Sequence, residues 1–406
     1  MTPISASDLS RWLTHPDLIE LEDWAQLVAR VKELGVGEAT LDAIRCLRNC
    51  AAVNSEQKRL MVEDHILLNT VIRIVTDFDL EVKRSEPSWI LVRVSLQFLH
   101  NVLVNESCAV LVPHLSALSR LLGATDIKTV NFTASVIGHV VKNDANELAA
   151  EHWALLLEAV SIESNFALLS INAALRHDAL AILNCYEDFN LDQRCILLDI
   201  IIENKTNSCS NESVIDLVRS RFKQQSTLIL TTMKASNQPL EPSEVTRLLQ
   251  ILIMVSSKES TKNLVQGDKS LLIDTLYLLR MIHDLGKQDP NSPFAPVRKV
   301  SDENGKLSLG TDPAFGFKRD LVRLLGNLCW EHKGNQDEVR ELDGIALILD
   351  CTSIDERNEF IKEWALFALR NLCSDNAENQ AFLSQVDRNG PIQTDLEKEL
   401  GIKLKL

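Results

Sequence analysis

Two stretches of the sequence, FKRDLVRLLGNLC (residues 317–329) and IKEWALFALRNLC (residues 361–373), decide the fold. Six, three and two residues before Asn371, and one after it, stand Ala365, Ala368, Leu369 and Leu372. The same offsets from Asn327 give Leu321, Leu324, Leu325 and Leu328. These offsets share one face of a helix with 3.6 residues per turn. Each stretch is therefore predicted to be an amphipathic helix with an asparagine at a fixed place beside its apolar stripe.

The same pattern recurs around four polar residues earlier in the chain, namely Asn49, Asn101, His139 and Asn184. Asn184 fits least well, because Asp178 occupies a position where an apolar residue is expected. The gaps between successive anchor residues are 52, 38, 45, 143 and 44 residues, and the long gap divides into about three ordinary repeats. A period of about 40 to 47 residues is typical of armadillo and HEAT repeats.

A second element follows two of the anchor residues at a fixed distance. Asn335-Gln336 lies eight and nine residues after the first asparagine quoted above, and Asn379-Gln380 lies at the same offsets after the second. Gln57 stands eight residues after the earliest anchor of the chain. Because spacing is kept on both sides of the anchor, the pattern indicates a repeated helix–turn–helix unit. We therefore predict an all-α, right-handed solenoid of stacked armadillo/HEAT-like repeats.

Composition limits the function. Hydrophobic residues make up 45% of the 406 residues but aromatic residues only 5%, so aliphatic side chains are expected to fill the interior. The net charge of −15 opposes binding to phosphate backbones and anionic lipids, and we expect no nucleic-acid partner.

No apolar run approaches the roughly 18 residues that cross a bilayer, and the first residues lack a secretory pattern. We expect a cytoplasmic protein without membrane insertion.

The chain contains nine cysteines, which could suggest a disulfide framework. Four of them lie on or beside the apolar stripes: Cys46, Cys50, Cys329 and Cys373. Cysteine in such a position behaves as a small apolar residue. We predict reduced core cysteines.

The chain divides into four parts. Residues 1–285 keep helical periodicity with few breakers and are predicted to form N-terminal armadillo-like repeats. Residues 286–316 hold four of the eleven prolines and four of the fourteen glycines, which oppose helix formation, so an exposed, mobile loop is predicted there. Residues 317–390 hold the two clearest repeats, and residues 391–406 form a C-terminal tail.

Two serines in the predicted loop are candidate phosphorylation sites. Ser301 has a basic residue, Arg298, three positions before it, and Ser292 precedes a proline. A phosphate on either serine could pair with nearby arginines. The loop is therefore a regulatory hypothesis.

The C-terminal stretch resembles one known family. The matching segments, in order and spacing, are Phe317 to Cys329, Asn335-Gln336-Asp337, Glu341 to Ile345, Glu363-Trp364-Ala365 and Leu369 to Leu372. They resemble the C-terminal armadillo region of the ataxin-10 family over about 70 residues, whereas the first 285 residues match it in repeat character.

The resemblance implies a non-enzymatic scaffold that binds other proteins, including a G-protein beta subunit and the O-linked N-acetylglucosamine (O-GlcNAc) transferase. It also implies roles in Ras and MAP-kinase signalling, neuronal survival, neurite outgrowth, cytokinesis and ciliary basal bodies. The resemblance further implies that the protein is cytoplasmic and extends to the perinuclear region, the basal body or the midbody. Homo-oligomerisation stays open.

An asparagine inside a helix needs a reason, because its amide competes for backbone hydrogen bonds. One interpretation is a ladder of amides lining a concave groove and binding the main chain of an extended partner. The residues of that site are Asn49, Asn101, Asn327 and Asn371, with Arg48 and Arg370. The other interpretation is that each amide ties adjacent repeats together, which is the commoner use of such bonds.

Other specific functions find little support. Nuclear-import receptors carry a tryptophan four residues before the asparagine, where this chain has Arg45, Gln97, Ser135, Leu180, Arg323 and Phe367, so basic nuclear-localisation peptides are not expected. No motif brings catalytic groups, a cofactor or metal ligands together, and no enzyme is predicted. The alternative function is an armadillo co-chaperone or nucleotide-exchange factor for a chaperone ATPase.

Overall fold

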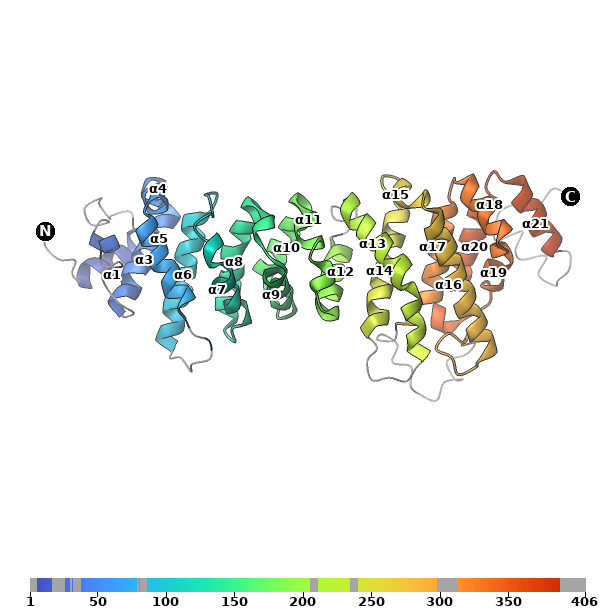
Figure 1. Ribbon diagram of the computed structural model, residues 1–406, viewed down its shortest axis with the longest axis horizontal. Coiled ribbons are helices and arrows are strands. Elements are labelled where there is room, and N and C mark those ends of the chain that lie inside the picture. The colour runs from blue at the N-terminus through green and yellow to red at the C-terminus, as the bar shows by residue number, and fades with distance from the viewer. Residues whose placement is uncertain are drawn as a thin grey trace. The chain divides into compact units, whose positions relative to one another are not determined.

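The computed structural model describes residues 6–16, 26–29, 31, 38–78, 80, 86–204, 211–233, 240–297 and 313–387. In these ranges the regular structure is helical throughout and contains no strand (Figure 1). The all-α prediction is confirmed. The chain divides into two compact units, Met1–Ile196 and Leu197–Leu406, and each is described by itself.

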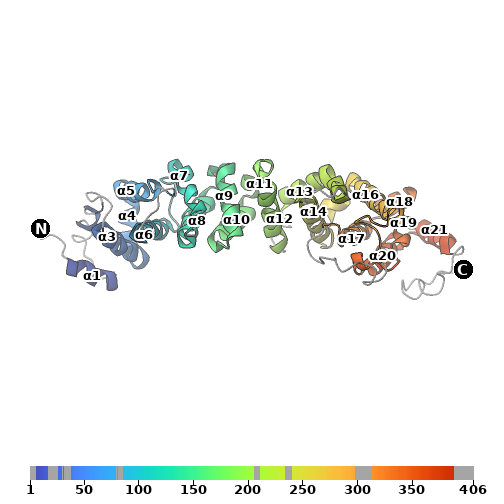
Figure 2. The same ribbon diagram turned by 90° about the horizontal axis from the view of Figure 1, so that it is seen from below.

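In the first unit the helices that pack on one another in chain order are α3 (Glu38–Val53), α6 (Glu86–Leu103), α8 (Ile127–Asn143) and α10 (Asn165–His177) (Figures 1 and 2). The helices beside them are α1 (Ala6–Thr14), α4 (Ser55–Glu63), α5 (His65–Thr76), α7 (Leu115–Ser119), α9 (Ala150–Ser161) and α11 (Ala179–Leu183). Short 3-10 helices cover Val112–His114, Arg120–Gly123, Ala145–Glu147 and Tyr186–Asp188. Helix α12 (Leu191–Glu203) contains the boundary between the units.

In the second unit the corresponding stack consists of α14 (Leu240–Ser256), α17 (Phe317–Cys329) and α20 (Ile361–Cys373). The remaining helices are α13 (Glu212–Gln225), α15 (Asn263–Gln266), α16 (Lys269–Gln288), α18 (Lys333–Glu341), α19 (Gly344–Asp350) and α21 (Ala377–Asp387). Two 3-10 helices cover Ser226–Met233 and Glu356–Asn358.

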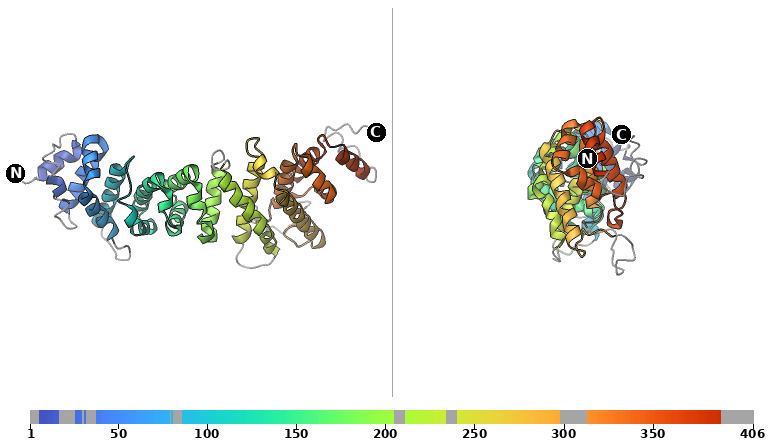
Figure 3. Two further views of the ribbon diagram at one scale, coloured as in Figure 1. Left: turned by 45° about the horizontal axis from the view of Figure 1, so that its top comes forward. Right: turned by 90° about the vertical axis from the view of Figure 1, so that its right-hand side faces the viewer.

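Both units are built from a three-helix repeat that begins with a helix of the stack. Helices α3, α4 and α5 form such a repeat in the first unit, and α17, α18 and α19 form one in the second. The blue-to-green helices of the first unit follow one another in chain order in Figure 3 (left). Because every repeat packs on its neighbours, the architecture is the predicted solenoid of armadillo-type repeats.

The apolar stripes read from the sequence are the surfaces on which the helices pack. Leu321, Leu324, Leu325 and Leu328 are fully buried, as are the corresponding residues of α20. Gly326 permits the close approach of α17 and α20, because a Cβ there would lie 3.1 Å from Ala368 Cα. Gly138, which also precedes an anchor residue, lies against the side chain of Ser170 in α10, whose Oγ would be 2.5 Å from an added Cβ.

The cysteine prediction is confirmed. Cys46, Cys50, Cys329 and Cys373 are buried and free of disulfides. Burial raises the pKa of the Cys50 thiol to about 12, with a contribution from Cys46. The thiols therefore remain protonated and unreactive at neutral pH.

The predicted loop at 286–316 differs from the structure where the structure describes it. Helix α16 continues to Gln288, and Gly286 lies against the main chain of Phe294, so this glycine allows a close contact rather than ending the helix. Phe294, Ala295 and Val297 are buried. Val297 N donates to Asp355 Oδ1 (3.1 Å), and Val297 O accepts from Glu356 N (2.8 Å). The prediction of an exposed segment is therefore wrong for Ser292, Phe294, Ala295 and Val297, whereas residues 289–291 and Pro296 are exposed as predicted. Residues 298–312 and the tail from residue 388 lie outside the described residues.

Candidate functional site

The anchor asparagines donate their side-chain amides to the preceding element of the stack. Asn101 Nδ2 lies 3.1 Å from Arg48 O, and Asn371 Nδ2 lies 2.8 Å from Gly326 O. In both cases the acceptor immediately precedes the anchor asparagine of the earlier repeat. The other bonds are Asn49 Nδ2 to Leu13 O (3.0 Å) and Asn327 Nδ2 to Ile253 O (3.4 Å) and to Ser256 Oγ (3.0 Å).

These bonds favour the structural interpretation of the asparagines. Asn371 is 0% exposed, so the prediction that it contacts a partner is wrong: its amide is enclosed between α17 and α20. Asn327 is 6% exposed but lines a hollow described below. Asn49 and Asn101 are half-buried, and their contact with a partner stays a prediction.

The two arginines next to anchor residues differ in their surroundings. Arg48 donates from Nε (3.0 Å) and Nη2 (2.8 Å) to Asn49 Oδ1, and from Nη1 to Gln97 Oε1 (2.6 Å). Arg48 is thus part of the bonding between α3 and α6. Arg370 is exposed on α20 and remains accessible.

His139 takes the place of the asparagine in α8. Its Nε2 lies 2.9 Å from His100 Nδ1, so it reaches the residue that precedes Asn101 through a side chain rather than a carbonyl. Ser135 Oγ lies 2.6 Å from the same His100 nitrogen. Burial, with charge repulsion from His100 and two lysines, lowers the pKa of His139 to about 4. Both rings are therefore neutral at pH 7.

The prediction of an anchor at Asn184 is wrong. Asn184 is exposed and follows the last residue of the short helix α11, whereas the stacked helix of that repeat is α10. Asp178, which broke the apolar pattern, lies in the break between α10 and α11.

The Asn-Gln pairs cap the C-terminal ends of the stacked helices. In each repeat the asparagine donates to the residue after the anchor, and the glutamine donates to the residue after that. The bonds are Asn335 Nδ2 to Leu328 O (2.8 Å), Gln336 Nε2 to Cys329 O (3.2 Å), Asn379 Nδ2 to Leu372 O (2.7 Å) and Gln380 Nε2 to Cys373 O (2.7 Å). The last carbonyls of a helix have no partner within it, and these amides satisfy them.

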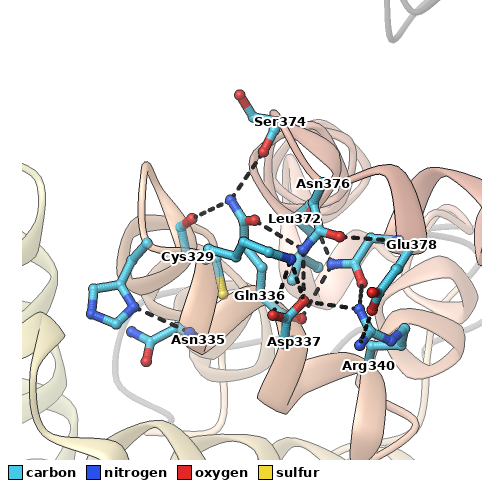
Figure 4. Close-up of polar contacts among 12 residues, drawn as sticks. Cys329, Asn335, Gln336, Asp337, Arg340, Leu372, Ser374, Asn376 and Glu378 are labelled. Atoms are coloured by element: carbon cyan, nitrogen blue, oxygen red, sulfur yellow. Dashed lines mark hydrogen bonds and ion pairs between the residues drawn. The ribbon is translucent and has the colours of Figure 1, made fainter.

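Gln336 also reaches into the next repeat. Gln336 Nε2 donates to Asn371 O (2.9 Å) and to Ser374 O (3.3 Å), and Figure 4 shows the bond to Ser374. One repeat earlier, Gln266 Nε2 donates to the matching carbonyls of Asn327 (3.1 Å) and Trp330 (2.9 Å). The repeated Asn–Gln pairs are visible in the sequence. Only the structure shows that their amides join neighbouring repeats.

The amides of Gln266, Asn335, Gln336, Asn379 and Gln380 are together called the amide ladder. Charged groups surround it. Asp337 Oδ1 accepts from Asn376 Nδ2 and from Arg340 Nη1, both at 2.9 Å, and Arg340 Nη2 lies 2.7 Å from Glu378 Oε2 (Figure 4). Burial opposes the charge of Asp337, but hydrogen bonds from Asn376, Lys333 and Arg340 outweigh it and lower the pKa of this carboxyl. The network bonds α18 to α21.

The second unit contains a hollow of about 430 Å³ among α14, α17 and α20. The lining residues are Ser256, Ser257, Glu259, Lys262, Arg323, Asn327, Trp330, Trp364 and Phe367. The guanidinium carbon of Arg323 lies 4.4 Å from the centre of the Trp364 ring, and Phe367 meets that ring edge-on at 5.6 Å. This volume lies within the usual range for ligand sites.

The charges of this hollow are unevenly paired. Lys262 Nζ lies 2.8 Å from Glu259 and 3.1 Å from Glu331. Arg323 has no carboxylate within ion-pair distance among the described residues, and Asp320 on the same helix is bonded to Arg319. Burial lowers the pKa of Arg323, but a guanidinium stays protonated at neutral pH. The hollow therefore offers one unpaired cation on an aromatic surface.

A second hollow of about 430 Å³ lies beside the start of α20. It is lined by residues 354–356 and 358–363. Ile354 and Phe360 are both 67% exposed there. Phe360 adopts a left-handed backbone with a φ of 62°, which is unusual for an aromatic residue.

Neither serine of the predicted loop is supported as a phosphorylation site. Ser292 is 3% exposed, and its Oγ accepts from Phe294 N (3.2 Å), so the prediction of an accessible Ser292 is wrong. The packing of residues 294–297 buries it. Ser301 lies outside the described residues.

In the described ranges, no three His, Cys, Asp or Glu side chains gather as metal ligands. No single described helix is long and apolar enough to cross a membrane, although the bent pair Asn165–His177 and Ala179–Asp188 meets the criterion by length and composition alone.

Comparison with solved structures gives armadillo repeat proteins. A chain from a study of the interaction between cadherin and beta-catenin matches 91% of this chain and 72% of its own length, with 14% identity and a TM-score of 0.37. A designed armadillo repeat protein matches 86% of this chain and 98% of its own length, with 12% identity and a TM-score of 0.24.

Comparison with sequences identifies the family. Residues 317–406 match the family model described as the spinocerebellar ataxia type 10 protein domain. Human ataxin-10 is 27% identical over 385 residues, which cover 90% of this chain and 79% of the relative. The ataxin-10 homolog of Dictyostelium discoideum is 48% identical over 89 residues, 22% of this chain and 15% of the relative. Ataxin-10 of Xenopus tropicalis is 30% identical over 389 residues, covering 89% of this chain and 78% of the relative, and this chain belongs to the ataxin-10 family.

Proposed function

We propose that the chain is a non-enzymatic scaffold of the ataxin-10 type and that a segment of a partner protein docks in the hollow lined by Arg323, Trp364 and Phe367. The observation that carries the proposal is the aromatic lining of this hollow. Tryptophan and arginine are enriched among the residues that dominate binding energy at protein interfaces. A hollow holding two tryptophans, a phenylalanine and an arginine suits such a role.

The asparagines hold the hollow in shape. Asn327 ties α17 to α14, and Asn371 ties α20 to α17. The Asn–Gln pairs bond the last carbonyls of α17 and α20, next to these asparagines at the C-terminal ends of the two helices. A rigid surface binds more tightly than a mobile one, because less conformational freedom is lost on binding.

The cellular setting of the scaffold follows the family. We propose a cytoplasmic protein, extending to the perinuclear region, the basal body or the midbody, that serves Ras and MAP-kinase signalling, neurite outgrowth and cytokinesis. The proposed partner classes are a G-protein beta subunit and O-GlcNAc transferase.

Site-specific photo-cross-linking tests the docking proposal. A benzophenone amino acid replaces Trp330, which lines the hollow, or Tyr277, an exposed residue of α16 that does not. In cells of the source organism, the Trp330 position is expected to capture specific proteins that the Tyr277 position does not. The captured partner is then expected to bind the Trp364→Ala variant about thirtyfold more weakly, as for a central interface aromatic.

Two outcomes contradict the proposal. Equal capture at both positions would show that the hollow has no special role. Unchanged affinity of Trp364→Ala for the captured protein would place binding elsewhere. A chaperone ATPase as the main captured protein, with faster nucleotide exchange, would favour the co-chaperone alternative.

A further inference from the structure

The hollow among α14, α17 and α20 has a definite charge as well as an aromatic lining. Its three charged lining residues are Glu259, Lys262 and Arg323. Glu259 is bonded to Lys262, and Lys262 is also held by Glu331. The cation left over is Arg323, in a chain whose net charge is −15. The lining side chains, two cations and one carboxylate, therefore carry one net positive charge, and the exposed carboxylate of Glu331 beside Lys262 lies outside the lining.

Arg323 is poorly satisfied by the protein itself. Its Nε is enclosed and makes no hydrogen bond to any described residue. Its guanidinium carbon lies over the ring of Trp364, 4.4 Å from the ring centre. A guanidinium carries five N–H donors, and a carboxylate matches their geometry with two parallel bonds. Stacking on an aromatic ring leaves the edge of the guanidinium available for such a pair.

The neighbouring groups suit an extended peptide. Trp364, Phe367 and Trp330 offer aromatic surface for a large apolar side chain. The Nδ2 of Asn327 is committed to Ile253 O and Ser256 Oγ, so the amide group it offers to a ligand is the oxygen. An oxygen acceptor can take a main-chain N–H from an extended segment.

The same arrangement disfavours a basic ligand. A lysine or arginine on the Trp364 side of the hollow would face the like charge of Arg323, whereas Glu259 and Glu331 both lie beside Lys262. Like charges at short range repel, and the repulsion grows where water is excluded.

We infer that the occupant of this hollow is an extended acidic peptide segment, in which a carboxylate beside a large apolar residue pairs with Arg323 while the apolar side chain packs on Trp364 and Phe367. This inference rests on the proposed function, since it names the chemistry of the segment that docks there.

Selection of peptides tests the acidic preference even while the partner protein is unidentified. The full chain is used to select from a phage-displayed library of random twelve-residue peptides, with the Arg323→Gln variant as counter-selection. The enriched peptides are expected to carry Asp or Glu beside Leu, Ile, Phe or Trp. Synthetic fluorescein-labelled copies are expected to bind Arg323→Gln at least about tenfold more weakly by fluorescence anisotropy, as for a lost charge-assisted pair.

Three controls make the result specific. Arg370→Gln removes an exposed arginine of the neighbouring helix that does not line the hollow, and it should leave binding unchanged. Replacing the acidic residue of the peptide with its amide should weaken binding to the parent chain but not to Arg323→Gln. Thermal unfolding of Arg323→Gln checks the fold, and Arg323→Lys, which keeps the charge, should retain part of the affinity.

The outcomes separate this inference from the proposed function. Enrichment of neutral or basic peptides whose binding is lost in Trp364→Ala but not in Arg323→Gln would overturn the acidic preference and leave the hollow as the docking site. Peptides insensitive to both substitutions, or no enrichment at all, would overturn both.

Discussion

Gln336 Nε2 lies 2.9 Å from the main-chain oxygen of Asn371, so a side chain of one repeat closes the C-terminal end of the stacked helix in the next. The same nitrogen serves Cys329 O in its own repeat and Ser374 O beyond the anchor. Gln266 bonds the corresponding oxygen of Asn327 at 3.1 Å. Because the bonds to Asn371, Cys329 and Asn327 are buried at the contact between repeats, water cannot replace the amide there, and these bonds help to set the register of stacking.

Replacing Gln336 with leucine tests the ladder. The substitution keeps the size of the side chain but leaves three carbonyls without this donor. We expect the free energy of unfolding to fall by about 2–4 kcal/mol, because each buried polar group left unsatisfied costs about 1–3 kcal/mol. Urea denaturation followed by circular dichroism measures the change.

Gln380→Leu is the matched control. Gln380 occupies the same place in the following repeat, but its amide bonds only Cys373 O among the described residues. The expected loss is about 1 kcal/mol. Equal losses in the two variants would mean that the bonds between repeats add nothing to the cap.

Local sequence predicted the stacked helices, because an amphipathic stripe is a property of neighbouring residues. The apolar stripes around Asn327 and Asn371 correctly predicted the helices α17 and α20. The acceptor of Asn371 is Gly326, 45 residues away, and it is set by how two helices cross. Spacing along one chain segment carries no information about that crossing, so the sequence alone left both interpretations of the asparagines open.

The hollow was not predictable from the sequence for the same reason. In the sequence, Arg323 and Phe367 are distinguished only by occupying a position where another class of protein has tryptophan. Their role depends on α14, which lies about 70 residues before α17 in the chain and supplies Ser256. The prediction that Ser292 is accessible is wrong because it rests on composition, and proline and glycine content predicts exposure. In the structure, the contact of Val297 with Asp355 holds the segment that contains Ser292 against the protein.

Gly326→Leu is expected to separate α17 from α20. A Cβ at this position would already lie 3.1 Å from both Ala368 Cα and Ala368 Cβ, and backbone there cannot move aside easily. Overpacking of this kind typically costs about 1–3 kcal/mol. The melting temperature should fall accordingly.

Gly267→Leu provides the comparison within the same unit. No atom lies within 4 Å of the Cβ position of Gly267, so the added side chain meets open space. A similar fall in melting temperature for both variants would show that close packing at Gly326 is unimportant.

His139 should make the first unit sensitive to acid. Its pKa in the folded chain is about 4, below the ordinary value of 6.5, because the neutral ring is favoured by burial next to His100 and near Lys142 and Lys58. The unfolded chain therefore takes up the proton first as the pH falls. Stability is complete above about pH 6.5 and is lost toward pH 4, with about 2 kcal/mol of the loss from this residue between pH 7 and pH 5.

The variant His139→Asn restores the residue found at the equivalent position in α6 and removes this titration. Urea denaturation at pH 7 and pH 5 should show a smaller loss of stability in the variant than in the parent chain. His177→Asn, at an exposed histidine of α10, should keep the loss seen in the parent. An unchanged pH dependence in His139→Asn would show that the pair of histidines does not control acid stability.

Phe360 stands immediately before α20, and its carbonyl accepts from Trp364 N (3.1 Å). Its φ of 62° lies in the left-handed region, which costs roughly 1–2 kcal/mol for a residue with a Cβ, and its ring is 67% exposed. Phe360→Gly removes the strain and loses little packing, although glycine gains entropy in the unfolded chain. We expect a net gain of about 0.5–1 kcal/mol in the free energy of unfolding.

Phe360→Ala keeps a Cβ and therefore the strain, so it should show no gain in the free energy of unfolding. The difference between the two variants in urea denaturation isolates the backbone effect. If Phe360→Gly were no more stable than Phe360→Ala, the left-handed backbone before α20 would be unstrained, and the prediction would be wrong.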